Sequence, residues 1–358
     1  MTIKSQSLMN LRLPAGIEKI DRVIEGYQIY QALLSAMELG LFEFLNDKGP
    51  SDRNIIAQGI GINGMFSRDF LDTLVDSGFL ARNDEKYINT KAATDFLLAQ
   101  SPFYQGDWIQ NATKSSYWKE LTTLLRREHP AMDNFNTGPS STFMDALAQR
   151  SLRGELQAVT EAISSWKGFY GDNNLLDLGG GHGIYAIELC QAHRNLKGVI
   201  FDKPHVIDTT LRYITEYQLQ ERLSVQSGDI CSDNIGTGYD IIIISHLLYK
   251  FRKELGPIFD RICASLNPGG LLVTNHWFCA TGCVSESSGV QELAKSLQSF
   301  GHPLCHVEEY DNLFHKKGFK IISTSTVPTS FGPSRLNLAV KTKGTLETIS
   351  CGSKKCCH

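Results

Sequence analysis

The chain of 358 residues has no apolar run near the ~18 residues that a membrane-spanning helix requires, and its first residues lack the apolar core of a signal peptide. Neither charge dominates, because 35 Lys and Arg stand against 38 Asp and Glu. This balance gives no reason to expect nucleic acid or an anionic membrane as a partner. The nine cysteines form no compact disulfide framework, which is typical of reduced thiols. We therefore expect a cytoplasmic protein with neither partner.

The most informative stretch is residues 174–183, which read Asn-Leu-Leu-Asp-Leu-Gly-Gly-Gly-His-Gly. The pattern predicts a short buried strand, a glycine turn, and a helix that begins at the turn. Such a turn brings bare backbone close to a ligand at a helix N-terminus. A second apolar run ends in Asp202, 19 residues after Gly183, where a carboxylate can accept hydrogen bonds from ribose hydroxyls.

The glycine spacing differs from the Gly-x-Gly-x-x-Gly pattern of dinucleotide sites, because the glycines occupy positions 179, 180, 181 and 183. Asp177 lies two residues before the turn, where its carboxylate can approach a cationic ligand. S-adenosylmethionine, with a cationic amino group, a sulfonium and no phosphate, fits this combination. The alternative is a structural turn that binds nothing, and the position of Asp202 argues against it.

Residues 1–105 are predicted to form three helices and a hairpin, with the hairpin at residues 78–89. This order is that of a winged helix, a fold that often binds DNA. Residues 1–105, however, carry 10 basic and 13 acidic side chains, whereas phosphate contacts require the opposite balance. The apolar segment 27–45, broken at Gly40, is expected to be buried in a core or against a partner subunit.

Residues 106–170 are predicted to be a helical connector with one long helix over residues 143–166. From residue 171 onward strands and helices alternate, which favours βαβ units and a mostly parallel sheet. The expected strands are residues 175–178, 199–202, 223–227, 239–245, 270–276 and 319–327.

The end of the chain, residues 344–358, is polar and is expected to be a flexible tail. Its four soft ligands leave a metal-binding or redox tail as the alternative. They are Cys351, Cys356, Cys357 and His358.

In their order and spacing, the motifs of residues 26–343 resemble the two-domain, S-adenosylmethionine-dependent O-methyltransferases of plants and bacteria. The matching motifs include Asp177-Leu-Gly-Gly-Gly-His-Gly, Phe201-Asp-Lys-Pro-His-Val, Gly228-Asp-Ile and Leu266-Asn-Pro-Gly-Gly. The resemblance implies an α/β fold, with a Rossmann-like class I methyltransferase domain at 171–343 preceded by a mainly helical, winged-helix-like dimerisation domain at 1–105. It also implies a homodimer that methylates a small-molecule substrate. Two other hypotheses stay open: a winged-helix regulator with a decayed methyltransferase domain, and a family member with non-methylating chemistry.

The resemblance implies roles for individual residues. Gly179 and Gly181 would line the methionine part of the cofactor, Asp202 would bind the ribose, and Asp229 and Ile230 would bracket the adenine. A plain turn at 228–229, or a helix cap at Asp202, is the alternative. The full set of expected cofactor-binding residues is Asp177, Gly179, Gly181, Asp202, Gly228, Asp229, Ile230 and Ser245.

The catalytic segment departs from the family pattern. O-methylating members carry a Leu-His-Asp-Trp-like segment after the fourth strand, whose histidine deprotonates the substrate hydroxyl. Here residues 244–251 read Ile-Ser-His-Leu-Leu-Tyr-Lys-Phe, and the match at Leu248 and Phe251 places Tyr249 where that histidine belongs. Neutral tyrosine, with an ordinary pKa near ~10, is a poor proton acceptor. Tyr249 and His246 are the candidate catalytic residues, and S- or C-methylation is a plausible alternative to O-methylation.

The region after the fifth strand is expected to supply the substrate pocket. Cys279, Cys283, Cys305 and His306 are soft ligands, but their spacing is not that of a standard zinc module. Isolated buried cysteines usually act as small apolar residues, so no metal site is predicted. The expected substrate-binding residues are Phe143, Met144, Trp277, Cys279, Cys305 and His306.

Overall fold

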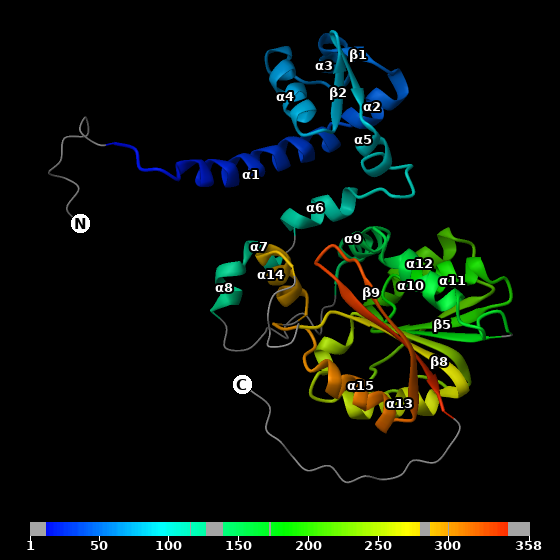
Figure 1. Ribbon diagram of the computed structural model, residues 1–358. Helices are drawn as coiled ribbons and strands as arrows, with labels where there is room; N and C mark the ends of the chain where they lie inside the picture. Colours follow the sequence, from blue (N-terminus) through cyan, green and yellow to red (C-terminus); the bar gives the residue numbers. More distant parts are fainter. Residues whose placement is uncertain are drawn as a thin grey trace. The chain divides into compact units, whose positions relative to one another are not determined.

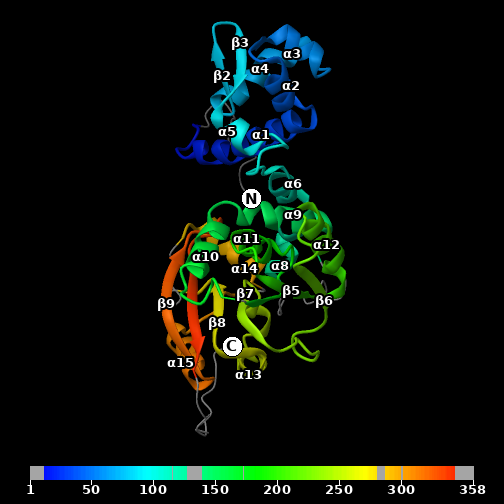
Figure 2. The ribbon, with the colours of Figure 1, turned by 90° about the vertical axis from the view of Figure 1, so that its right-hand side faces the viewer.

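The computed structural model describes residues 12–114, 116–126, 139–171, 173–279, 287–299 and 301–342. Cys283 and the four soft ligands of the tail lie outside these ranges. The chain divides into two compact units between Gln110 and Asn111, and each is described by itself (Figures 1 and 2). Within the described ranges, no helix has both the length and the apolar character that a membrane crossing demands.

The first unit consists of helices and a small sheet. Its helices are α1 (Ile17–Glu38), α2 (Leu41–Lys48), α3 (Arg53–Gly59), α4 (Gly64–Asp76) and α5 (Lys91–Phe96). Its strands are β1 (Ser51–Asp52), β2 (Leu80–Asn83) and β3 (Lys86–Asn89), in the sheet order β1-β3-β2. The predicted hairpin is confirmed as β2 and β3. The predicted break at Gly40 is also confirmed, because Gly40 takes a left-handed φ of 66° before α2 begins.

Helix α1 begins earlier than the sequence predicted, at Ile17 rather than Tyr27. Its first half carries a row of exposed apolar side chains, with Val23 75% exposed and Tyr27 62% exposed. The row recurs every three or four residues, so it occupies one face of the helix. An apolar face of this length on a helix is typical of a surface that meets another protein surface. Its members are Ile17, Ile20, Val23, Ile24 and Tyr27.

The second unit is built on a seven-stranded sheet in the order β6-β5-β4-β7-β8-β10-β9. Strands β6, β5, β4, β7 and β8 are parallel, and β10 runs antiparallel to both of its neighbours. β10 was not predicted from the sequence, whereas the other six strands were. Their bounds are β4 (Asn174–Leu178), β5 (Lys197–Asp202), β6 (Leu223–Ser227), β7 (Tyr239–Ser245), β8 (Leu266–His276), β9 (Phe319–Val327) and β10 (Ser334–Lys341).

Helices cover both faces of this sheet (Figure 1). Alternate residues of a strand point to opposite faces, so Leu175 and Ile241 pack with one set of helices while Leu176 and Ile242 pack with the other. The first set is α10 (Glu155–Ser164), α11 (Ile184–Ala192) and α12 (Ile207–Glu216); the second is α13 (Leu255–Ser265) and α15 (Val307–Lys316). From β4 the chain adds β5 and β6 on one side of the sheet and then returns to add β7 and β8 on the other. Rossmann-like sheets bind ligands at such a reversal of strand order.

The connector is helical, but one prediction about it was wrong. The long helix expected over 143–166 is two helices, α9 (Ser141–Ser151) and α10, because Gly154 takes a left-handed φ of 106° between them. The remaining helices of this unit and connector are α6 (Gly106–Lys114), α7 (Ser116–Lys119), α8 (Leu121–Leu125) and α14 (Gly289–Gln298).

Candidate active site

A cavity of about 780 Å³ lies at the carboxyl ends of β4, β5 and β7. This volume is in the usual range of sites for small molecules and cofactors. Acidic, basic and aromatic side chains line it together with backbone of the glycine turn. Its lining includes Phe143, Met144, Arg150, Glu155, Asp177, Gly179, Gly181, His182, Tyr185, Asp202, Gly228, Ile230, Ser245, His246 and Trp277.

The glycine turn after β4 has the conformation that its sequence predicted. Gly179, Gly181 and Gly183 all have a positive φ, between 57° and 75°, which residues with a Cβ rarely adopt. The Gly181 amide donates a hydrogen bond of 2.8 Å to Oδ2 of Asp202. The fold therefore brings the turn and the acid together at the cavity, although they lie on different strands.

Asp177 is a buried carboxylate at the end of β4, only 1% exposed. Its Oδ2 has no hydrogen-bond partner among the described residues. Burial, and secondarily the charge of Asp202, raises the pKa of Asp177 to about 7. The Ala186 amide hydrogen-bonds to this carboxylate, but a buried carboxylate with one oxygen left unpartnered is unfavourable unless a cation or a proton compensates it. This position thus suits a ligand with a positively charged group.

Of the three predicted residues after β6, two line the cavity and one does not. Gly228 and Ile230 line it, whereas Asp229 accepts a hydrogen bond of 2.5 Å from Nζ of Lys203. This lysine holds the pKa of Asp229 below its ordinary value. The Asp229 carboxylate is therefore already engaged by Lys203.

Tyr249 lies behind the cavity wall and is not among the described residues that line it. Its hydroxyl accepts a hydrogen bond of 2.6 Å from the Trp277 amide and lies 2.8 Å from Nδ1 of His246. Burial raises the pKa of Tyr249 well above 10. A phenol in this setting remains protonated, and its hydroxyl is hydrogen-bonded to Nδ1 of His246.

His246 does line the cavity, and its other ring nitrogen is engaged too. Nε2 lies 2.8 Å from Oε1 of Glu155, and the ring centroid is 4.2 Å from that of Trp277. His246 also has a left-handed φ of 49°, which is unfavourable for a residue with a Cβ. Strained conformations of this kind occur preferentially at functional sites.

Glu155, the first residue of α10, is a component of the site that the sequence analysis missed. Tyr185 and Asn275 donate hydrogen bonds to its Oε1, of 2.9 and 3.0 Å. Burial alone would raise the pKa of Glu155, but His246 and then Arg150 outweigh it and hold that pKa at about 2. Glu155 is therefore an ionised carboxylate. In the sequence, Glu155 could have been noticed only because it lies next to the apolar residues that form the buried face of α10.

The other predicted residues divide into two groups. Phe143, Met144, Trp277 and Ser245 line the cavity. Cys279, Cys305 and His306 are not among the lining residues, and His306 is an exposed residue at the start of α15.

Comparisons with known proteins place this geometry in context. Residues 118–320 match the model of the O-methyltransferase domain, and residues 22–99 match that of the O-methyltransferase dimerisation domain. The N,N-dimethyltransferase OxyT of Streptomyces rimosus is 25% identical, over 86% of this chain and 91% of that protein. The tetracenomycin polyketide synthesis 8-O-methyl transferase TcmO of Streptomyces glaucescens is 29% identical, over 74% of this chain and 78% of that protein.

A solved structure shares the fold. Human N-acetylserotonin methyltransferase in complex with S-adenosylmethionine superimposes with a TM-score of 0.72 and 22% identity, covering 94% of this chain and all of that one. At this identity the likeness bears on the fold alone, and it agrees with the expected methyltransferase architecture.

Proposed function

Because the chain belongs to the O-methyltransferase family of S-adenosylmethionine-dependent methyltransferases, we propose that it methylates a small molecule whose attacking atom needs no prior deprotonation. Such atoms are an amine nitrogen, a thiolate or thioether sulfur, and an electron-rich ring carbon. The observation that carries the proposal is the state of the family's base position: it holds the protonated Tyr249, and both ring nitrogens of the neighbouring His246 are engaged, Nδ1 by the Tyr249 hydroxyl and Nε2 by Glu155.

The proposed acceptors make chemical sense of Glu155. An amine, a thioether or a ring carbon becomes cationic when it receives a methyl group, and a nearby carboxylate stabilises that charge. For an amine or a ring carbon, the proton then leaves an already acidic cation, for which a weak acceptor suffices. The ionised Glu155, paired with His246 at the cavity wall, supplies the negative charge. A phenol would need its proton removed first.

The cofactor would occupy the part of the cavity formed by the glycine turn. When bound, it supplies a methyl group activated by the sulfonium. We assign Asp177 to its cationic amino group, because the orphaned Oδ2 lacks a partner. Gly179 and Gly181 would let backbone approach the ligand, and Asp202 would accept hydrogen bonds from the ribose. Gly228, Ile230 and Ser245, which line the cavity, would contact the rest of it, whereas the Asp229 carboxylate is held by Lys203.

We also propose that the protein acts as a homodimer. The match of residues 22–99 to a dimerisation domain supports this, as does the exposed apolar row on α1. A second copy of the chain would bury that row.

Methyl-labelled cofactor tests the proposal directly. The purified protein is incubated with four single-ring acceptors of similar size, namely an aniline, a thiophenol, an electron-rich ring without hydroxyl groups, and a phenol. Mass spectrometry of the products locates the label. We expect methylation of one or more of the first three and little of the phenol. Phenol methylation that exceeds all the others, and that His246→Ala abolishes, would show that His246 is a conventional base and would refute the proposal.

A further inference from the structure

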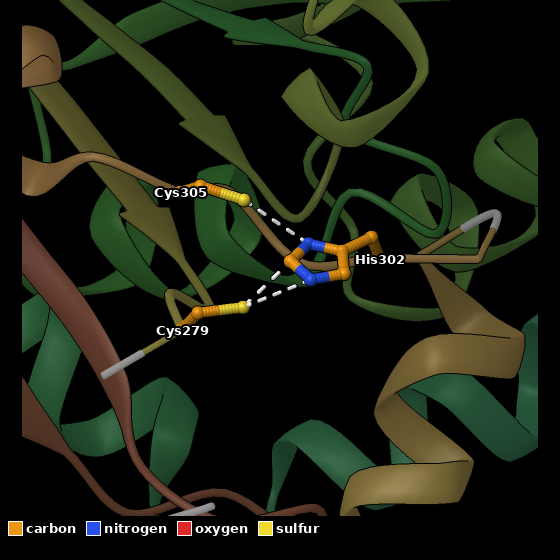
Figure 3. A group of neighbouring side chains, drawn as sticks. All are labelled: Cys279, His302 and Cys305. Atoms are coloured by element: carbon orange, nitrogen blue, oxygen red, sulfur yellow. Dashed lines mark hydrogen bonds between the residues drawn. The ribbon is translucent and has the colours of Figure 1, made fainter. Parts of the chain in front are cut away.

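Three soft side chains converge outside the cavity lining, as Figure 3 shows. The Cys279 sulfur lies 3.4 Å from Nε2 and 3.5 Å from Nδ1 of His302. The Cys305 sulfur lies 3.1 Å from Nδ1, which is also 2.9 Å from the Pro303 carbonyl oxygen. One ligand atom from each of the three residues lies within 4.8 Å of the others, and all three residues are half-buried. The two cysteines are thiols rather than a disulfide.

The backbone holds this cluster in place. After β8 the chain pairs with the segment that precedes α15, through a bridge between Phe278 and Leu304. The Cys279 amide donates a hydrogen bond of 2.8 Å to the Leu304 carbonyl, and the Leu304 amide donates one of 3.1 Å to the Trp277 carbonyl. Cys279 and Cys305 each directly follow a bridge residue, so the pairing fixes the two thiols side by side.

We propose that Cys279, His302 and Cys305 bind a single zinc ion, with the fourth coordination position open to water or another ligand. Two thiolates and an imidazole are the donors that zinc prefers. In tetrahedral coordination, Zn–S bonds of about 2.3 Å and Zn–N bonds of about 2.0 Å place sulfur and nitrogen roughly 3.5 Å apart. Nδ1 of His302 donates to the Pro303 carbonyl oxygen at 2.9 Å, which leaves Nε2 as the ligand atom. The Cys279 sulfur lies 3.4 Å from Nε2, already close to this value, and the ligand atoms of the three residues lie within 4.8 Å of one another.

The charges around the cluster also suit the site. Two thiolates neutralise the charge of Zn²⁺, and the two thiols release their protons on binding. The guanidinium of Arg252 lies close enough to interact electrostatically with both sulfurs. Three protein ligands are the number found in zinc sites that keep an exchangeable position, whereas structural sites have four.

A zinc ion here would fix one wall of the cavity. Trp277 lines the cavity and lies two residues before Cys279. The ion would join its segment to residues 302–305 through metal–ligand bonds in addition to the backbone pairing. Zinc binding itself does not depend on the proposed acceptor chemistry.

The test must separate this site from the tail. We therefore use the full chain carrying Cys351→Ser, Cys356→Ser, Cys357→Ser and His358→Ala, loaded with zinc and dialysed. We expect one zinc per chain. Cys279→Ser, His302→Ala or Cys305→Ser should each weaken zinc binding by more than the roughly 10–100-fold that loss of an outer-shell partner costs. Cys263→Ser, a half-buried cysteine elsewhere in the unit, is the matched control and should bind zinc like its parent.

Two further measurements keep the test decisive if a variant fails to fold. When Co²⁺ replaces zinc in the tail-substituted parent, a thiolate-to-cobalt charge-transfer band should report the cysteine ligands, and intense d–d bands should report tetrahedral coordination. Zinc should also protect Cys279 and Cys305, but not the exposed Cys231, from alkylation mapped by peptide mass spectrometry. Absence of bound zinc from the tail-substituted parent, or a Cys279–Cys305 disulfide in the purified protein under reducing conditions, would overturn the proposal.

Discussion

Replacing Asp177 by Asn should stabilise the ligand-free protein and weaken its binding of the cofactor. The pKa of Asp177 is raised from 3.8 to about 7 in the folded protein. Between these values the unfolded chain has released the proton while the folded chain still holds it, so rising pH destabilises the folded state. At 1.36 kcal/mol per pKa unit, the destabilisation reaches about 4 kcal/mol above pH 7. Asparagine has no charge to bury, so this contribution disappears.

Denaturant unfolding of the two proteins at several pH values measures this effect. The stability difference between Asp177→Asn and wild type should grow by about 2.5 kcal/mol from pH 5 to pH 8. Asp208→Asn, at an exposed carboxylate on α12, should show no such growth. Wild-type affinity for S-adenosylmethionine should rise as the pH passes about 7, because the ionised carboxylate pairs with the cationic amino group. Parallel pH profiles for Asp177→Asn and wild type would refute the reasoning.

Three other variants test the remaining assignments. Asp202→Ala removes the acceptor of the Gly181 amide and the proposed ribose contact. It should therefore weaken cofactor binding by roughly 10–100-fold in calorimetric titration, and unchanged affinity would remove Asp202 from the site. Tyr249→Phe deprives Nδ1 of His246 of its hydrogen-bond partner, so turnover should fall while the cofactor Kd stays within about two-fold; an unchanged rate would separate Tyr249 from the chemistry. The double change Ile20→Glu and Ile24→Glu places two charges in the apolar row of α1, and light scattering should report a monomer; a persistent dimer would locate the interface elsewhere.

The parts of the fold that are local in sequence could be predicted from it. A buried strand, a glycine turn and a helix follow one another over residues 174–192, and Asp202 ends the next strand. Parallel strands bring their carboxyl ends to one edge, so the proximity of the turn and Asp202 followed from topology. By contrast, β10 pairs antiparallel with β8 and β9, and nothing local to residues 334–341 specified those partners.

The missed site residues depend on contacts between distant segments. Glu155 and His246 are 91 residues apart, and no motif joins them. The soft-ligand cluster uses His302, whereas the sequence drew attention to His306 beside Cys305. His306 has a positive φ of 58° and precedes the first residue of α15 as its N-cap. The bridge between Phe278 and Leu304 instead brings the two cysteine-bearing segments together, and His302 is the histidine that lies near both sulfurs. Which histidine lies near the two cysteines depends on contacts between segments that are distant in sequence, and the spacing of residues in the sequence does not predict such contacts.

The left-handed backbone of His246 has an evolutionary consequence. A non-glycine residue in that conformation costs on the order of 1 kcal/mol, which a glycine at position 246 would recover. The same change would remove the imidazole that pairs with Glu155 and leave this buried carboxylate without its main partner, which costs more than the strain. Relief of the backbone strain by itself would therefore not stabilise the protein. We expect glycine at position 246 only in relatives that have also replaced Glu155, so that these two distant positions change together.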